Sequence, residues 1–429
     1  MKIAIIGGAG VRVPLLANGL TTSDVPIDEI ALFDIDWERL AIIGSLASQF
    51  APCVRTYADA AACVSGADVV FLSIRAGGIR ARARDEAIAL ESGTVAQETV
   101  GPGGFAMAMR NAPRAVEYAQ LVERTAPRAW VINFTNPVGI VTQAMTMASN
   151  ARVIGICDTP TELFEEVAQL LGIASSECRF DYFGLNHLGW LREVFHEGRP
   201  QLGRLWEQPE LLARVYRARL FEPAFLQALR LLPTEYLFYY YRPERALENT
   251  RKAGQTRGGA IADLNDQLFR DLARPNGDRR RAYEAYLESR NAGYMQIESG
   301  SAQPIARSPW ADLTGYDKIA LSVVRAIHFN SNAIIPLNVS NRGSIGDLDD
   351  ADIVEVPCTV NADGARPLGV GRVPDTVRDL LVRVKEYERL TVDASRRRSE
   401  ESAVRALAAN PLVRDAGLAE RLVHALDLT

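Results

Sequence analysis

The sequence predicts an α/β protein, in which a Rossmann-like doubly wound sheet is followed by a second α+β domain, as in lactate and malate dehydrogenases. Two observations lead to this prediction. Apolar runs of strand length alternate with helical patterns through the first half of the chain, and the alternation weakens after about Cys157. A glycine-rich turn also stands between the first apolar run and the first helical pattern.

The expected strands of the first half are continuous runs of Val, Ile, Leu and Phe, which are typical of parallel strands buried on both faces. These strands are expected over residues 2–7, 30–34, 67–74, 129–136 and 153–157, and the first helix over 14–20. Helical patterns also fill the segments between the later strands. This alternation predicts one parallel sheet with helices on both of its faces.

The second half of the chain mixes element types. We expect strand with aromatic interruptions over 180–195, mostly helix over 210–272, short strands with tight turns over 334–360, and helix over 373–428. The sequence contains no internal repeat and no low-complexity linker. The second domain is therefore expected to pack directly on the first.

The composition excludes several classes of protein. The 429 residues are enough for roughly two or three domains. The net charge of -5 argues against nucleic acid or a membrane surface as a partner. Five cysteines, an odd number, do not suggest a disulfide framework and suit a reducing compartment. No charged leader precedes the first strand, and no apolar run reaches the ~18 residues of a membrane span. We expect a soluble, cytoplasmic protein.

The turn after the first strand has the features of a dinucleotide site. Gly7, Gly8 and Gly10 allow the backbone to approach a pyrophosphate, which the next helix holds through its free N–H groups. Asp34 ends the second strand, where a carboxylate accepts hydrogen bonds from the ribose hydroxyls and repels a 2′-phosphate. Val13 occupies the usual third-glycine position, and Arg12 could meet an additional phosphate. The pattern favours NAD over NADP.

A thiol and an imidazole follow this nucleotide-binding half. Cys157 lies in the segment CDTP and His187 in the segment GLNHLGW. Cysteine and histidine together bind divalent transition metals, and two protein ligands leave positions open for a substrate. Either residue alone is more often a buried core residue. As a pair after a nucleotide fold, they suggest redox chemistry on a substrate that chelates the metal.

Motifs along nearly the whole chain resemble the family 4 glycoside hydrolases, which are NAD- and metal-dependent glycosidases. No single motif decides the resemblance, but so many in the same order are highly specific. Besides the glycine turn, CDTP and GLNHLGW, the motifs are RARDEAI at 82–88, QETVGPGG at 97–104, NFTNPVGIV at 133–141, NVSNRGSI at 338–345, EVPC at 355–358 and VKEYERLT at 384–391.

The resemblance implies a redox route to glycoside cleavage. Cys157 and His187 would bind a divalent ion, commonly Mn²⁺, while sugar carbon 3 passes a hydride to NAD and later receives it back. Between these two steps a base removes the proton of carbon 2, the aglycone leaves by elimination, and water adds. We therefore divide the chain into an NAD-binding domain, 1–180, and an α+β domain, 181–429, for substrate, metal and oligomer contacts.

The resemblance also implies the acid–base residues. We map the base to Tyr236, with Tyr239 and Tyr240 as alternatives, and expect a nearby metal and cation to lower its pKa. Glu98 matches a carboxylate that raises the basicity of this tyrosine; alternatively it caps the start of a helix. Asp158 follows the metal cysteine, where α-acting members carry an acid aspartate and β-acting members often carry asparagine. It would protonate the leaving group or hydrogen-bond beside the metal ligands.

Three further residues match substrate contacts of the family. They are Arg82, Asn136 and Arg257. Asn136 ends a buried strand at the carboxyl edge of the sheet, where ligands collect in such folds. Arg257 follows a helical segment, a position that more often carries a surface charge.

Several motifs, among them 338–345 and 355–358, look like the β-acting branch, so we expect a 6-phospho-β-glucosidase that takes phosphorylated disaccharides. The α-specific activity and the hydrolysis of unphosphorylated glycosides stay open as alternatives.

A 2-hydroxy-acid dehydrogenase is a wider alternative, although His196 and His328 lack the setting of a proton shuttle. A nucleotide sensor would have no use for Cys157, His187 and Tyr236 together. We also expect a homo-oligomer, a dimer or tetramer, with the aromatic run 238–241 in the core or at an interface.

Overall fold

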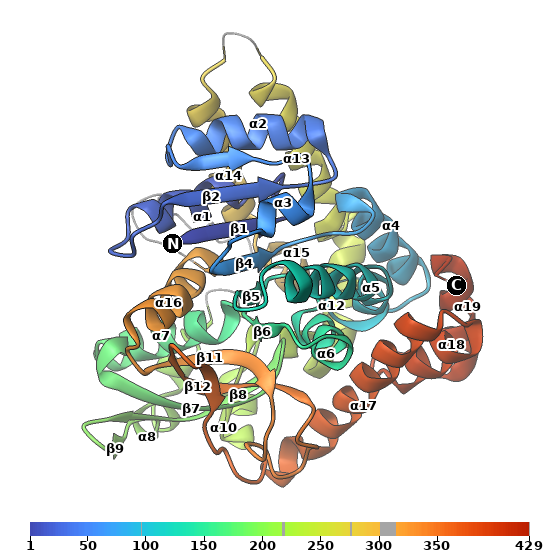
Figure 1. Cartoon of the computed structure of the whole chain (residues 1–429). Coiled ribbons are helices and arrows are strands. Elements are labelled where there is room, and N and C mark those ends of the chain that lie inside the picture. The colour runs from blue at the N-terminus through green and yellow to red at the C-terminus, as the bar shows by residue number, and fades with distance from the viewer. Residues whose placement is uncertain (96, 217–218, 275–276, 301–314, 429) are drawn as a thin grey trace.

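The computed structural model describes residues 1–95, 97–216, 219–274, 277–300 and 315–428. Over these residues the protein is a mixed α/β structure whose strands form two sheets (Figure 1). The larger sheet contains, from one edge to the other, β13 (Gly364–Pro367), β12 (Ile353–Asn361), β11 (Ala333–Ser340), β6 (Arg152–Gly155), β5 (Trp130–Asn133), β4 (Val69–Leu72), β1 (Lys2–Ile6), β2 (Glu29–Phe33) and β3 (Val54–Thr56).

Strands β1 to β6 are parallel and lie in the order β3-β2-β1-β4-β5-β6. In this dinucleotide-binding order, ligands bind at the carboxyl ends of β1 and β4, where the strand order reverses. Ile3 and Ile5 are buried in one apolar cluster, and Ala4 and Ile6 are buried in a second one. Alternate side chains of β1 are therefore buried on both faces, and the predicted doubly wound sheet is confirmed.

Three antiparallel strands from the second half extend this sheet. β11 pairs with β6 at Asn338 and Gly155, β12 pairs with β11, and β13 pairs with β12. The segment 334–360, expected as short strands, instead forms two long strands paired from Ala333–Val360 to Ser340–Ile353. The sheet therefore continues across residue 180, and the division of the chain there stays a prediction.

The smaller sheet contains β7 (Cys178–Leu185), β8 (Leu188–His196), β9 (Arg199–Pro200) and β10 (Leu232–Pro233). The segment 180–195 is thus a hairpin rather than one interrupted strand. Its turn is Asn186 and His187, and His187 has a φ of 62°. At Gly184 an added Cβ would lie 2.3 Å from the carbonyl oxygen of Leu188, so only glycine allows the two strands to approach so closely.

Helices surround both sheets. They are α1 (Val13–Thr21), α2 (Trp37–Ser48), α3 (Ala60–Val64), α4 (Gly78–Glu91), α5 (Gly101–Thr125), α6 (Val138–Ala148), α7 (Thr159–Leu171), α8 (Gly203–Trp206), α9 (Pro209–Leu212), α10 (Pro223–Leu229), α11 (Phe238–Tyr241), α12 (Pro243–Ala253), α13 (Arg257–Leu272), α14 (Arg279–Ala292), α15 (Gln296–Ser299), α16 (Tyr316–Phe329), α17 (Asp375–Arg397), α18 (Glu400–Ala409) and α19 (Ala416–Leu426). Short 3₁₀ helices cover η1 (Ser175–Glu177) and η2 (Glu235–Leu237).

The C-terminal segment 373–428 is helical, as expected, and α17 packs on α5 and α6 along one side of the molecule (Figure 1). The segment 210–272 is helical with interruptions at β10 and η2; its residues 217–218 lie outside the described part of the chain. Phe238 and Tyr239 of the aromatic run are buried within the chain.

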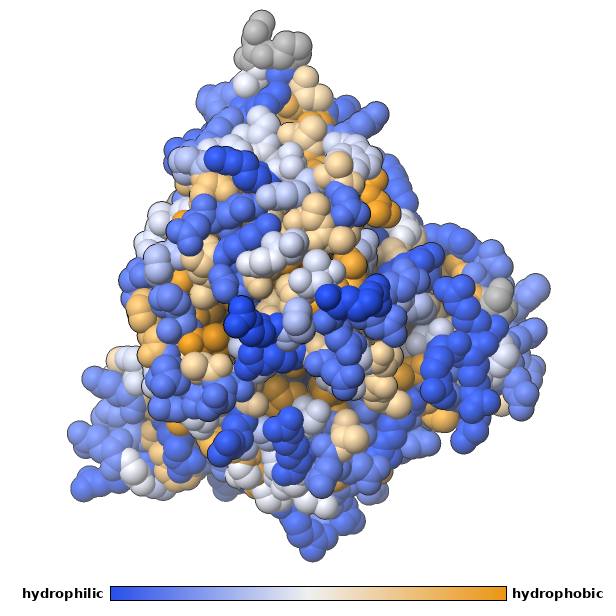
Figure 2. Space-filling view, in the orientation of Figure 1, coloured by the Kyte–Doolittle hydropathy of each residue, from blue (hydrophilic) through white to orange (hydrophobic). Residues whose placement is uncertain are grey.

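The surface carries mostly polar side chains. Figure 2 shows them over most of the visible face, with smaller apolar areas between them. Among the described residues no helix combines the length and the apolar character that a membrane crossing needs.

Candidate active site at the switch point of the sheet

A cavity of about 1030 Å³ opens where the strand order reverses between β1 and β4. It extends from the glycine turn to segments of the second half of the chain. Most of the predicted site residues line it, namely Gly7, Gly10, Asp34, Arg82, Glu98, Asn136, Asp158, Tyr236 and Arg257. The fold thus brings the expected cofactor, substrate and acid–base residues to one cavity.

The glycine turn is shaped by two close approaches. Gly7 has a φ of +96°, and an added Cβ would lie only 2.0 Å from the carbonyl oxygen of Ser73. The N–H groups of Gly7 and Gly8 donate to the carbonyl oxygen of Phe33 at 3.0 and 2.8 Å. No side chain fits at Gly7, so the bare backbone of the turn forms this end of the cavity.

Asp34 lies at the end of β2 and bonds to the glycine turn. Its Oδ2 accepts a hydrogen bond from the Ala9 N–H, and its Oδ1 accepts one from the Asp36 N–H, both at 3.0 Å. The carboxylate also lines the cavity. Asp34 is therefore placed to contact a ligand and to fix the turn at the same time.

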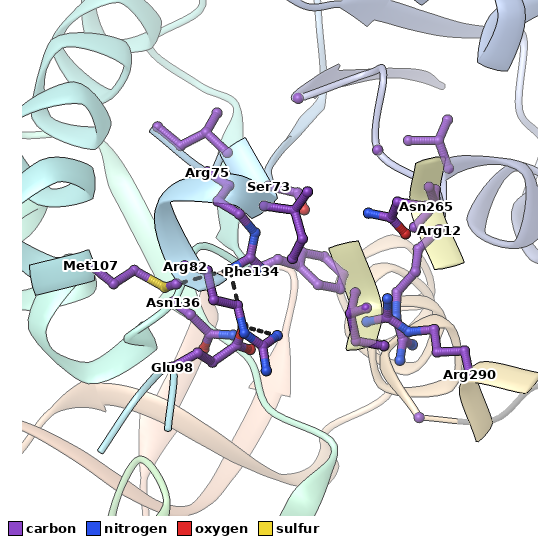
Figure 3. A pocket seen from close by; sticks show the side chains of 18 of the residues that line it. Arg12, Ser73, Arg75, Arg82, Glu98, Met107, Phe134, Asn136, Asn265 and Arg290 are labelled. Atoms are coloured by element: carbon purple, nitrogen blue, oxygen red, sulfur yellow. Dashed lines mark hydrogen bonds and ion pairs between the residues drawn. The ribbon is translucent and has the colours of Figure 1, made fainter. Parts of the chain in front are cut away.

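Arg82, Glu98 and Arg75 form a buried charge cluster on one side of the cavity (Figure 3). Arg82 pairs with Glu98 and donates to Glu86 Oε1 at 2.8 Å, and Arg75 donates to Glu98 Oε2 at 3.0 Å. Burial alone would raise the pKa of Glu98, but the two guanidinium groups outweigh it and lower that pKa to about 2. Glu98 is therefore ionised, and it does not cap α5, whose cap position is Val100.

Asn136 follows β5 and precedes Pro137 in a cis peptide bond. Its carbonyl oxygen accepts a hydrogen bond from Asn111 Nδ2 at 2.7 Å. Its side-chain Oδ1 is buried and makes no hydrogen bond to any described residue. Because a buried polar atom without a partner is costly, this oxygen is suited to accept a hydrogen bond from a ligand in the cavity.

His187 is buried at the tip of the β7–β8 turn. Its ring stacks on the ring of Tyr236, with 3.7 Å between the centroids and 1° between the planes. Its Nδ1 lies 2.7 Å from Thr99 Oγ1. Burial lowers the pKa of His187 to about 4, so the imidazole is neutral at ordinary pH. A neutral imidazole is the form that binds metals.

Cys157 lies between β6 and α7 and is buried, with its Sγ 3.4 Å from Thr159 Oγ1. Burial raises the pKa of the thiol well above its usual range, and the carboxylates of Glu355 and Asp158 add to this effect. The thiol also acts on the pKa of Tyr236, whose ring stacks on His187. Tyr236 therefore stacks on one of the two expected metal ligands and is affected electrostatically by the other.

A thiol and a neutral imidazole are a donor set that suits a divalent transition metal. Among the described residues, no group of three or more His, Cys, Asp or Glu side chains could hold a metal ion.

Tyr236 lies in η2 and lines the cavity together with Tyr239. Burial raises the pKa of Tyr236 well above its usual range, and the charges of Glu235 and Glu98 raise it further. The protein's own groups thus act against the expected lowering, because a buried phenolate next to two carboxylates is poorly solvated. Of the three candidate tyrosines, Tyr236 is the one that stacks on His187.

Asp158 occupies the cap position of α7, yet its side chain makes no capping hydrogen bond. It lines the cavity instead. Burial raises the pKa of its carboxyl, and the charges of Arg12 and Arg290 oppose the increase. A raised pKa favours the protonated form, which an acid catalyst requires.

Arg257 is the first residue of α13 and lines the cavity, so it is not the surface charge that such a position more often carries. Its guanidinium donates to the carbonyl oxygens of Gly293 and Arg290 at 2.7 and 2.8 Å. Burial lowers the pKa of Arg257. The tertiary packing of α13 against α14 decides this location, which the local sequence does not reveal.

The sequence interpretation assigned no role to several residues of the site. Arg75 directly follows a predicted strand at the ligand-binding edge, and this position could have identified it. Thr99 lies in a recognised motif, but its contact with His187 is long-range. Tyr294 donates a hydrogen bond to Glu235, and no sequence signal pairs these two residues. Arg12, noted only for a possible phosphate, lies with Arg290 across the cavity from Glu98 (Figure 3).

Two models of a known protein family match the chain. The model of the family 4 glycosyl hydrolases matches residues 2–173, and the model of the family's C-terminal domain matches residues 182–413. The chain belongs to family 4 of the glycosyl hydrolases. The predicted resemblance is confirmed.

Family 4 relatives cover nearly the whole chain. A probable 6-phospho-beta-glucosidase of Bacillus subtilis is 30% identical, and the match covers 99% of this chain and 95% of that protein. The 6-phospho-beta-glucosidase of Thermotoga maritima, solved with NAD and glucose-6-phosphate, is 28% identical with a TM-score of 0.85, over 99% of this chain and 97% of that one.

A 6-phospho-alpha-glucosidase from gut microorganisms, solved with NAD and Mn²⁺, is 27% identical with a TM-score of 0.80, over 99% of this chain and 97% of that one. The relatives of this family 4 chain therefore include both anomeric specificities. The chain also resembles Cryptosporidium parvum malate dehydrogenase in fold, at 14% identity, a TM-score of 0.54, and coverage of 92% of this chain and 99% of that one. The dehydrogenase-like architecture is thus confirmed.

Proposed function

We propose that this family 4 glycosidase is an NAD- and divalent-metal-dependent 6-phospho-β-glucosidase. The observation that carries the proposal is the parallel stack of His187 on Tyr236, with the Cys157 thiol close enough to act on the same phenol. Tyr236 lines the cavity, whereas Cys157 and His187 are buried behind its wall, and the stack joins His187 to the expected base. Relatives solved with NAD, Mn²⁺ or glucose-6-phosphate support the cofactors and the phosphorylated substrate.

The residues present fit both NAD and a divalent metal ion. For NAD, the glycine turn presents bare backbone to the cavity, because a Cβ at Gly7 would collide with the Ser73 carbonyl oxygen, and the Asp34 carboxylate bonds to the same turn. For the metal, Cys157 supplies a thiol and His187 a neutral imidazole. When bound, NAD supplies reversible hydride transfer at sugar carbon 3, and a divalent ion polarises the neighbouring sugar oxygens.

The chain itself supplies the proton transfers. Tyr236 takes the proton from sugar carbon 2, and the ionised Glu98 makes the phenolate a stronger base by raising its pKa. Asp158, with its raised pKa, holds a proton for the departing glycosidic oxygen. Tyr236 and Asp158 thus have opposite roles, since one accepts a proton and the other donates one.

The substrate is held by groups on the cavity wall. Asn136 offers its unpaired Oδ1 to a sugar hydroxyl. Arg82 and Arg257 place positive charge on the wall, and arginine is well suited to a phosphate because its guanidinium forms two parallel hydrogen bonds. The motifs at 338–345 and 355–358 favour the β-type branch. Asp158 favours the α-specific enzyme, which is the second candidate function.

A panel of substrates tests the proposal. Nitrophenyl α- and β-glucosides, each with and without a 6-phosphate, are assayed with NAD and Mn²⁺. We expect turnover of the phosphorylated β-glucoside, loss of turnover in chelator, and no net accumulation of reduced NAD, because each turnover returns the hydride. Turnover of the α-anomer alone would select the second candidate. Stoichiometric reduction of NAD would instead indicate a dehydrogenase.

Asp34→Ala is expected to weaken NAD binding about 10- to 100-fold, since hydrogen bonds to a charged group contribute about 1.5–3 kcal/mol. Loss of the bond to Ala9 would also loosen the glycine turn. Calorimetric titration with NAD measures the effect. Asp59→Ala is a matched control, because Asp59 accepts a backbone hydrogen bond from Ala62 outside the cavity. Equal NAD affinity of the two variants would contradict the role of Asp34.

A further inference from the structure

The loop before α5 orders a chain of hydrogen bonds that ends at His187. The side-chain Oε1 of Gln97 accepts hydrogen bonds from the backbone N–H groups of Thr99 and Val100, the latter at 2.9 Å. Two N–H donors directed at one atom identify it as the amide oxygen, which cannot donate. The hydroxyl of Thr99 lies 2.9 Å from the same oxygen and donates its single proton there.

This assignment decides which ring nitrogen of His187 carries the proton. Thr99 Oγ1 also lies 2.7 Å from His187 Nδ1. Having donated its proton to Gln97, the hydroxyl can only accept at this second contact, so Nδ1 must carry a hydrogen. The reverse direction would leave the Thr99 oxygen and the Gln97 oxygen 2.9 Å apart with no proton between them, and their lone pairs would repel.

The other ring nitrogen is then unprotonated. A neutral imidazole carries a proton on only one of its nitrogens, and the Thr99 contact places that proton on Nδ1. The parallel stack on Tyr236 fixes the plane of the ring. Together the stack and the Thr99 contact set both the orientation of the ring and the direction of its free lone pair.

We propose that Gln97 and Thr99 are positioning residues that hold His187 as the Nδ1–H tautomer, so that the lone pair of Nε2 is set in advance for a divalent transition metal. The metal role rests on the proposed function, whereas the tautomer itself is a property of the protein alone. A hydrogen bond to the second nitrogen of a metal-binding histidine usually fixes its tautomer and strengthens the ligand.

Nitrogen NMR of the metal-free chain tests the tautomer directly. The chain contains four histidines, so selective ¹⁵N-histidine labelling gives a simple spectrum, and a His187→Gln variant identifies the His187 signals. We expect the wild-type protein to show a protonated Nδ1 and an unprotonated Nε2. A protonated Nε2 in the wild-type protein would overturn the inference, and this measurement needs no further variant to fold.

Substitution of Thr99 tests the positioning role. Thr99→Val removes the hydroxyl and keeps the shape of the side chain, and we expect loss of the pure Nδ1–H tautomer and roughly 10-fold weaker binding of Mn²⁺. Thr99→Ser should restore both. The matched control is Thr250→Val, because Thr250 is buried in α12 and its hydroxyl donates within the helix to the Ala246 carbonyl oxygen. The Thr250→Val variant should change neither the tautomer of His187 nor the affinity for Mn²⁺.

The outcomes separate this inference from the proposed function. An unchanged tautomer and unchanged Mn²⁺ affinity in folded Thr99→Val would overturn the positioning role alone. A wild-type chain with the Nδ1–H tautomer that fails to bind Mn²⁺ would instead overturn the metal site, and with it the proposed function.

Discussion

Cys157→Ser is expected to abolish metal-dependent hydrolysis, with a loss in kcat/KM on the order of 10³-fold or more. A Lewis-acidic ion contributes several kcal/mol to the stabilisation of developing charge, and every 1.4 kcal/mol is a factor of about ten in rate. A thiolate binds a divalent transition metal more tightly than a serine hydroxyl does. The substitution alters one atom at a buried position, so the fold is expected to persist.

Rate assays with and without Mn²⁺ check this prediction, together with a direct titration of Mn²⁺. Cys63→Ser is the matched control: Cys63 is also buried, in α3, and belongs to none of the motifs of the candidate site. Its variant shows what the loss of a buried thiol costs in stability alone. Full activity of wild-type protein in chelator, or of Cys157→Ser in Mn²⁺, would exclude the metal role.

Tyr236→Phe is expected to stop the exchange of the substrate's carbon 2 proton with deuterated solvent and to lower kcat about 10²- to 10⁴-fold, the usual contribution of a general base. Phenylalanine keeps the ring, so the stack on His187 should survive while the oxygen is lost. Mass spectrometry of the products formed in deuterium oxide measures the exchange.

Tyr239→Phe distinguishes between the neighbouring candidates. Tyr239 also lines the cavity, but its hydroxyl lies 3.9 Å from the sulfur of Met295. If Tyr236 is the base, exchange persists in Tyr239→Phe and disappears in Tyr236→Phe. The opposite pattern would assign the base to Tyr239.

The parallel part of the fold was predictable because its signals are local. Runs such as residues 3–6 and Val69–Leu72 are apolar throughout, and a strand of this kind must be covered on both faces. The antiparallel extension was not predictable in the same way. β11 pairs with β6 far away in the chain, and the apolar pattern of a strand does not specify its neighbour.

The candidate site was likewise predictable only where its signals are local in the sequence. The motifs selected Cys157, His187, Asn136 and Glu98, and the fold brings Asn136 and Glu98 into one cavity. Their charge states depend on contacts that motifs do not contain. Glu98 is ionised because Arg82 and Arg75 surround it, whereas the pKa of Asp158 is raised because burial outweighs the charges of Arg12 and Arg290.

By itself, the sequence determined the parallel sheet, the glycine turn at Gly7 and the family to which the chain belongs. These depend on residue types and on spacings along the chain, which the sequence states directly. Only the tertiary structure decided that His187 stacks on Tyr236, that Thr99 contacts Nδ1, and that Arg257 faces the cavity. Each of these features requires segments distant in the chain to be held within a few ångströms, and packing of the whole core sets that distance.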